Sequence, residues 1–297
     1  MNRESFRSLI VGLVWVVGIF GGLIWLLSVV TGRSPTGDGS ERVVYRSVGG
    51  HELALWIFKP SDWRKEDHRP AVLWFFGGGF EVGIPSQFAK HAEAMAENGL
   101  VAMTVDYRVR SRHGSEVTPF DALDDARAAV GWVRTHAKEL GIDPERIAAA
   151  GGSSGGHLAA MCAIPGAWEG RVPIDAPNAL LLLNPAVDLD IPIVRERTDE
   201  KELASLMAIS PLRQLSDPLP PTLILHGTED VIVPLASSEA FLEKALQLGS
   251  ESVVLRTFPE QGHEFYLHGF DGNRGFNAAL EEIVDFLARL GWITPSS

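Results

Sequence analysis

Apolar runs and amphipathic segments alternate along most of the chain. Continuous apolar runs are typical of buried strands, and strict apolar–polar alternation is typical of half-buried ones. Strands are predicted on these grounds at 71–76, 100–106, 146–150, 179–183, 222–225 and 252–258. Between them, apolar residues recur every three or four positions, as in helices that pack on a sheet. The sequence therefore predicts an α/β fold, with a mostly parallel central sheet covered by helices on both faces.

Two segments do not follow this alternation. Residues 42–48 and 53–58 predict two strands joined by a tight turn at Gly49 and Gly50. Residues 185–218 lack a sheet pattern and are rich in charge and proline, which predicts a small helical insertion.

Residues 8–30 contain no charged side chain. As a helix rising about 1.5 Å per residue, this stretch would cross a hydrocarbon core of roughly 30 Å. Arg3 and Arg7 precede it and favour a cytoplasmic N-terminus. We therefore predict a membrane anchor at 1–32, a linker at 33–40 and a domain at 41–297 on the extracytoplasmic side, periplasmic or extracellular. A cleaved signal peptide, which would release a secreted domain, is the alternative.

Composition narrows the classes of ligand. Among 297 residues, 26 Lys and Arg stand against 38 Asp and Glu, and this net charge of −12 disfavours binding to nucleic-acid phosphates. The one cysteine, Cys162, excludes an intrachain disulfide. The histidines lack metal-ligand spacing, so we expect no metal and no cofactor. The acidic residues Asp121, Asp124 and Asp125 are better explained by a capped helix start after Thr118 than by a paired-carboxylate site.

Residues 149–157, Ala-Ala-Gly-Gly-Ser-Ser-Gly-Gly-His, lie between a predicted strand and a predicted helix. A serine between glycines at such a turn is typical of a nucleophile elbow, which exposes the hydroxyl above the sheet. Two overlapping Gly-x-Ser-x-Gly patterns are present, centred on Ser153 and on Ser154. The residue three positions after the nucleophile should be small, because the helix presses on the strand there. That residue is Gly156 for Ser153 but the bulky His157 for Ser154, so Ser153 is favoured.

A triple glycine, Asp230 and His263 also follow predicted strands, so they meet the elbow at the same edge of a parallel sheet. A serine needs a base within hydrogen-bond reach, and that base needs an acid to fix its tautomer. The sequence offers Ser153 as nucleophile, His263 as base and Asp230 as orienting acid.

The triple glycine at 77–79 frees backbone N–H groups to point at a ligand. We predict that the N–H groups of Gly78, Gly79 and Ser154 form the oxyanion hole of an acyl-transfer site.

Residues 151–159, Gly-Gly-Ser-Ser-Gly-Gly-His-Leu-Ala, resemble the elbow of the hormone-sensitive-lipase-like and feruloyl/acetyl-esterase-like (BD-FAE-like) carboxylesterases. Residues 76–80 resemble their His-Gly-Gly-Gly loop, and 105–108 and 226–234 resemble further family segments. The resemblance implies an α/β-hydrolase fold and a serine esterase with the triad named above. Phe76 stands where the lipase-like members carry histidine, and Ser154 replaces their usual alanine.

Three functions fit these residues. The favoured one is a serine carboxylic-ester hydrolase that acts through an acyl-enzyme on short-acyl or carbohydrate-linked esters. A peptidase of the prolyl-oligopeptidase kind has a similar elbow, but residues before Ala71 are too few for its usual propeller domain. A membrane-tethered binding protein on an inactive hydrolase fold is the third, although such proteins typically lose a triad residue.

Overall fold

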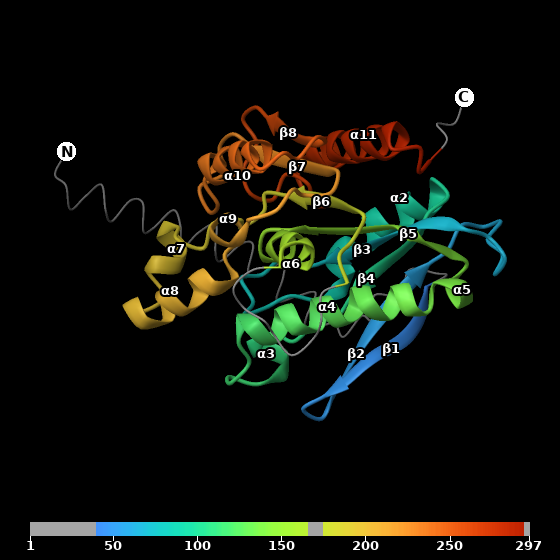
Figure 1. The fold of residues 1–297 in the computed structure, drawn as a ribbon, viewed down its shortest axis with the longest axis horizontal. Coiled ribbons are helices and arrows are strands. Elements are labelled where there is room, and N and C mark those ends of the chain that lie inside the picture. Colours follow the sequence, from blue (N-terminus) through green and yellow to red (C-terminus); the bar gives the residue numbers. More distant parts are fainter. Residues whose placement is uncertain (1–39, 166–174, 294–297) are drawn as a thin grey trace. The chain divides into compact units, whose positions relative to one another are not determined.

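A computed structural model of the protein describes residues 40–165 and 175–293 (Figure 1). The predicted anchor at 1–32 and residues 33–39 of the predicted linker lie outside this part of the chain. In the two described ranges, no helix combines the length and the apolar composition needed to cross a membrane.

The described residues form an eight-stranded sheet in the order β1-β2-β4-β3-β5-β6-β7-β8. The strands are β1 Glu41–Val48, β2 His51–Phe58, β3 Arg69–Phe75, β4 Val101–Val105, β5 Ile142–Gly152, β6 Ala179–Leu183, β7 Thr222–Gly227 and β8 Val253–Phe258. The first two strands form the predicted antiparallel hairpin, and β2 is antiparallel to β4. All pairs from β4 through β3 to β8 are parallel, so the carboxyl ends of these strands share one edge.

Helices fill the connections between strands. The longer ones are α2 Ala89–Glu97, α4 Pro119–Thr135, α6 Ser154–Ala163, α10 Leu235–Gln247 and α11 Arg274–Arg289. The predicted insertion at 185–218 contains short helices, namely α7 Pro192–Arg195, α8 Glu200–Leu206, the 3₁₀ helix η2 Met207–Ile209 and α9 Pro211–Gln214. The remaining short helices are η1 Pro85–Phe88, α3 Arg110–His113, α5 Ala137–Leu140 and η3 Asp271–Asn273.

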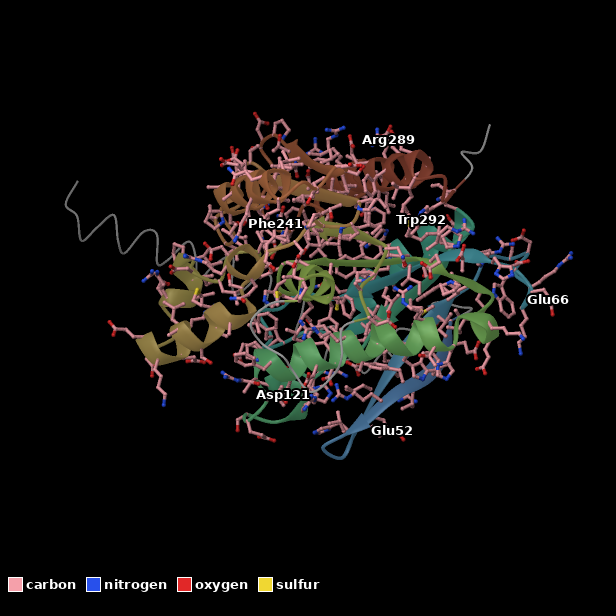
Figure 2. All side chains as sticks on the ribbon, viewed as in Figure 1. Glu52, Glu66, Asp121, Phe241, Arg289 and Trp292 are labelled. Carbon is pink, nitrogen blue, oxygen red and sulfur yellow. The ribbon has the colours of Figure 1, made fainter. Side chains whose placement is uncertain are left out.

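Two groups of helices cover the sheet, as predicted. Helices α2 and α11 contact one another through His91 and Phe276, whose ring centroids are 4.8 Å apart. In the other group, α4 packs on α6, and α9 contacts both α6 and α10 (Figure 1). Fully buried Phe241 of α10 lies among the side chains that fill the interior, whereas Glu52 and Glu66 lie exposed at the periphery (Figure 2).

Strand β5 begins at Ile142, four residues earlier than predicted, because Ile142 pairs with Arg69 of β3. Its pairing with β3 is irregular there: Arg69 pairs with Ile142, but Ala71 pairs with Ile147. Pro70 and Pro144 lie in this irregular stretch, and neither has an N–H group to donate to the ladder.

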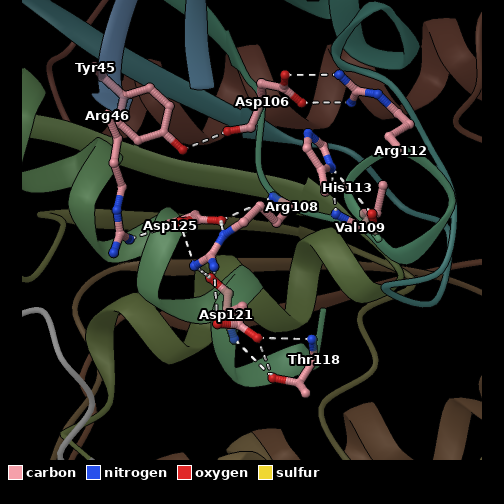
Figure 3. A network of polar contacts seen from close by, with 10 residues as sticks. All are labelled: Tyr45, Arg46, Asp106, Arg108, Val109, Arg112, His113, Thr118, Asp121 and Asp125. Carbon is pink, nitrogen blue, oxygen red and sulfur yellow. Dashed lines mark hydrogen bonds and ion pairs between the residues drawn. The ribbon is translucent and has the colours of Figure 1, made fainter. Parts of the chain in front are cut away.

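The acidic start of α4 is structural, as predicted. Thr118 and Asp121 form a capping box in which each side chain accepts from the other residue's backbone N–H. Fully buried Asp125 accepts three hydrogen bonds from Arg108, one from its backbone and two from its guanidinium, and also pairs with Arg46 at 2.8 Å (Figure 3). The buried carboxylate is thus neutralised by two arginines, and it fixes α4 to β1 and to the segment that follows β4.

Candidate active site

The serine turn lies at the carboxyl end of β5, where the strand meets α6. Ser153 has φ 54° and ψ −121°, a left-handed conformation that side chains other than glycine rarely adopt. Small neighbours are required here: a Cβ atom on Gly156 would lie 2.8 Å from Pro185 Cβ, and one on Gly155 would overlap the Phe75 carbonyl oxygen. The strand, the tight turn and the helix together form the elbow that the glycine pattern predicts.

The two candidate serines occupy different environments. Ser153 is at the turn itself and is half-buried, and no described residue hydrogen-bonds to its hydroxyl. Ser154 is the first residue of α6 and is buried. The Ser153 hydroxyl is thus without a hydrogen-bond partner among the described residues, whereas Ser154 Oγ accepts the Gly79 N–H.

Asp230 and His263 come from loops that follow adjacent strands, β7 and β8. His263 Nδ1 lies 2.7 Å from Asp230 Oδ2. The other carboxylate oxygen, Oδ1, accepts the backbone N–H groups of Ile232 and Val233 at 2.8 and 2.9 Å. A carboxylate partner at Nδ1 favours the tautomer that carries its hydrogen there, so the lone pair of Nε2 remains free to take a proton.

Asp230 is held in its ionised form. Burial raises its pKa, but hydrogen bonds from His226, His263 and the Val233 backbone reverse this effect and hold the pKa of Asp230 well below its ordinary range. His226 Nε2 lies 3.4 Å from Asp230 Oδ2 and 3.0 Å from the Val233 carbonyl, and its Nδ1 lies 2.8 Å from Ser238 Oγ. The sequence around His226 contained no signal for this contact with the carboxylate.

Asn184 joins the loops of Asp230 and His263, and nothing in its sequence context indicated this contact. It directly follows β6, is fully buried and has φ 40°. Its Oδ1 accepts the Gly227 N–H at 2.9 Å, and its Nδ2 donates to the carbonyls of Gly262 and His263 at 3.2 and 2.8 Å. One side chain therefore fixes the end of β7 relative to the backbone of His263.

The same loops also touch the serine turn. A Cβ atom on Gly152, the residue before Ser153, would overlap the hydroxyl of Tyr266. Tyr266 lies three residues after His263, so the histidine loop packs directly against the elbow.

The triple glycine belongs to residues 76–83, which we call the glycine loop. The glycines pack against the serine turn. A Cβ atom on Gly77 would come within 3.3 Å of Ser153 Cβ. Gly78 and Gly79 have φ of 141° and 63°, conformations that favour glycine. Among the described residues, no acceptor engages the Gly78 or Ser154 N–H, whereas the Gly79 N–H donates to Ser154 Oγ at 3.0 Å. The predicted oxyanion donors are thus adjacent to Ser153, but one of them is already hydrogen-bonded.

Phe76 occupies the position of the family's histidine and is fully buried. Its ring stacks on Tyr107 with centroids 4.0 Å apart, and its carbonyl accepts the Tyr107 hydroxyl at 2.5 Å. The described residues contain no group of three or more His, Cys, Asp and Glu side chains that could hold a metal ion.

The fold and the site agree with a known group of proteins. The family model BD-FAE matches residues 55–175. The structure of Est2, a thermophilic esterase from the planctomycete Thermogutta terrifontis, matches with a TM-score of 0.80 and 38% sequence identity, over 88% of this chain and 95% of that chain. This chain belongs to the α/β-hydrolase esterases.

Other members support the assignment of this α/β-hydrolase. Est2 has also been solved with propionate bound, and that structure is 37% identical over 89% of this chain and 100% of that chain, with a TM-score of 0.80. The probable carboxylic ester hydrolase LipM of Mycobacterium tuberculosis is 28% identical over 233 residues, which are 70% of this chain and 53% of LipM. The chain thus spans about half the length of this curated relative.

Proposed function

We propose that this α/β-hydrolase is a serine carboxylesterase that acts on esters with short acyl groups, with Ser153 as nucleophile, His263 as base and Asp230 as orienting acid. The observation that carries the proposal is the Asp230–His263 hydrogen bond at 2.7 Å, in a histidine loop that packs through Tyr266 against the strained turn of Ser153. Strain of this kind recurs where a functional side chain must be presented, although it costs about 1 to 3 kcal/mol.

In the proposed reaction, Ser153 Oγ attacks the ester carbonyl carbon while His263 Nε2 takes the hydroxyl proton. The tetrahedral intermediate collapses, and His263 returns this proton to the leaving alcohol. A water molecule then attacks the acyl carbonyl carbon and gives a proton to His263. The second tetrahedral intermediate collapses, His263 returns this proton to Ser153 Oγ, and the carboxylic acid leaves. The ionised Asp230 stabilises the imidazolium at each of the two stages.

The developing oxyanion needs donors in place before the reaction begins. The Gly78 and Ser154 N–H groups have no acceptor among the described residues and flank Ser153, so we assign the oxyanion to them. Loss of one such donor typically costs about 3 to 4 kcal/mol of transition-state stabilisation.

The proposed acyl size rests on relatives. Est2 has been solved with propionate and with butyrate bound, and these are short carboxylates. Because the Est2 match covers nearly all of both chains, we extend this preference to the present esterase.

Kinetics with p-nitrophenyl esters of two to twelve acyl carbons, an acetylated sugar and a peptide anilide test the proposal. We expect the highest kcat/KM with acyl groups of two to four carbons, and loss of this activity in Ser153→Ala. The serine-directed reagent diisopropyl fluorophosphate should add a diisopropylphosphoryl group to Ser153, located by fragmentation of the tryptic peptide 147–171, which also contains Ser154. Full activity in Ser153→Ala, or labelling of Ser154 alone, would refute the assigned nucleophile. Preferential cleavage of the anilide would favour a peptidase.

We also propose that residues 8–30 anchor the esterase with its catalytic domain on the extracytoplasmic side. The uncharged stretch and the preceding Arg3 and Arg7 support this orientation. The full-length protein, expressed in a bacterial host, should stay in the membrane pellet after alkaline carbonate extraction and should be digested by protease added to spheroplasts. Soluble, N-terminally shortened protein would instead indicate a cleaved signal peptide, and protection from protease would contradict the orientation.

A further inference from the structure

The glycine loop is held along its length by contacts from outside the loop. The Gly77 N–H donates to Gln87 Oε1 at 2.6 Å. The far end of the loop is held by the segment after β4, because the Arg110 N–H donates to the Phe80 carbonyl and the Ser111 N–H donates to the Glu81 carbonyl. Two further backbone groups of the loop, both near Ser153, are hydrogen-bonded to side chains.

Those two groups are the Phe76 carbonyl and the Gly79 N–H. The first accepts the Tyr107 hydroxyl at 2.5 Å, and the second donates to Ser154 Oγ at 3.0 Å. The two side chains also interact: burial raises the pKa of Tyr107, and a hydrogen bond from Ser154 acts in the opposite direction. The hydroxyls therefore link the elbow helix, the segment after β4 and the glycine loop.

The position of Tyr107 is itself strongly fixed. Asp106 on one side pairs with both terminal nitrogens of Arg112 at 2.7 and 2.9 Å, and Arg108 on the other side is bonded to Asp125 (Figure 3). The Tyr107 backbone thus lies between two ion pairs, and its phenol is a rigid support for the loop.

We propose that Tyr107 and Ser154 are positioning residues, which hold the glycine loop at the Phe76 carbonyl and the Gly79 N–H and leave the Gly78 and Ser154 N–H groups for the oxyanion. Gly79 then serves as an attachment point of the loop and not as an oxyanion donor. This inference rests on the proposed esterase function. The proposed support of the loop requires the hydroxyl of Ser154. The carboxylesterase families that this sequence resembles usually have alanine at this position, which has no hydroxyl.

The test compares Tyr107→Phe and Ser154→Ala with wild type in the full-length protein. A single neutral hydrogen bond is worth about 0.5 to 1.5 kcal/mol, so each change should lower kcat on p-nitrophenyl acetate about 2- to 13-fold. KM should stay within about twofold of wild type, because these side chains act through the loop and not through substrate binding. Hydrogen–deuterium exchange should become faster in peptides that cover residues 76–83.

Matched controls remove similar bonds elsewhere. Thr222→Val loses a hydroxyl that donates to the Pro220 carbonyl at 2.7 Å, and Ser250→Ala loses a hydroxyl that accepts the Leu219 N–H at 2.8 Å. Both controls should retain wild-type kcat and wild-type exchange in residues 76–83.

A kcat equal to or above wild type in Ser154→Ala would overturn the inference, as would unchanged exchange of the loop in both variants. If the inference is overturned in this way but wild type is active and Ser153→Ala is inactive, the proposed function stands without the inference. If wild type hydrolyses no ester, the proposed function fails, and the exchange measurement still decides whether the two hydroxyls hold the loop.

Discussion

Replacement of Asn184 by alanine should damage the candidate site more than it damages the fold. The side chain is fully buried and makes three hydrogen bonds, to the Gly227 N–H and to the carbonyls of Gly262 and His263. At about 1 kcal/mol each, their loss should lower the free energy of unfolding by about 3 kcal/mol. For a domain of this size, that corresponds to a fall in Tm of about 6 to 12 °C.

The catalytic effect should be larger. Asn184 is the only side chain, among the described residues, that bonds to the His263 carbonyl, and its loss frees the histidine loop to shift relative to β7. Because a displacement of about 1 Å can cost about 100-fold in rate, we expect kcat to fall by at least about 10-fold. KM should change little. Steady-state kinetics on p-nitrophenyl acetate, with thermal unfolding measured in the same buffer, provide both values.

Asn178 offers a matched control at the other end of β6. Its Oδ1 accepts the Ile147 N–H and an Arg134 N–H, both at 3.2 Å, and it lies away from the carboxyl edge of the sheet. Asn178→Ala should therefore lower Tm but leave kcat within about twofold of wild type. If Asn184→Ala and Asn178→Ala lose stability alike and both keep their kcat, Asn184 does not position His263, and the reasoning is refuted.

Two further predictions concern charge and packing. The pKa of Asp230 is depressed in the folded state, so its contribution to stability is present above its unfolded pKa of about 3.9 and is lost as pH falls toward the folded value. In chemical denaturation, Asp230→Asn should thus be less stable than wild type at pH 7, and the difference should shrink below about pH 4; a constant difference would contradict this. Gly155→Ala should prevent folding to a soluble protein, because its Cβ would overlap the Phe75 carbonyl. Gly131→Ala in α4 is the control, since a Cβ there would lie no closer than 3.8 Å to any atom outside the helix. This change should raise the free energy of unfolding by up to about 1 kcal/mol. Soluble, stable Gly155→Ala would show that the elbow packs more loosely than described.

The sequence predicted features that depend on local pattern. Strand β6 has the predicted bounds, and the Thr118 cap forms as expected, because an apolar run and a capping box are each complete within a few residues. The start of β5 was predicted four residues late, since it is set by the pairing of Ile142 with Arg69, which lie far apart in the sequence. The separate strands of the sheet were predictable for the same reason, and their parallel arrangement followed from the helices between them.

Contacts between distant residues were not predictable in this way. Asn184 before Pro185 has the composition of an ordinary turn, and its partners lie 43 to 79 residues away. Ser154 Oγ meets a glycine amide 75 residues earlier in the chain. The roles of these side chains depend on which loops the sheet brings together, and a single sequence contains no local signal for that.

The left-handed backbone of Ser153 also has an evolutionary consequence. Its φ of 54° would be adopted at lower cost by glycine, so Ser153→Gly should be more stable than Ser153→Ala and more stable than the native protein. Selection for stability alone would replace this serine. Under the proposed function, the native residue marks a trade-off, in which the chain accepts a less stable fold in exchange for a nucleophile at the end of β5.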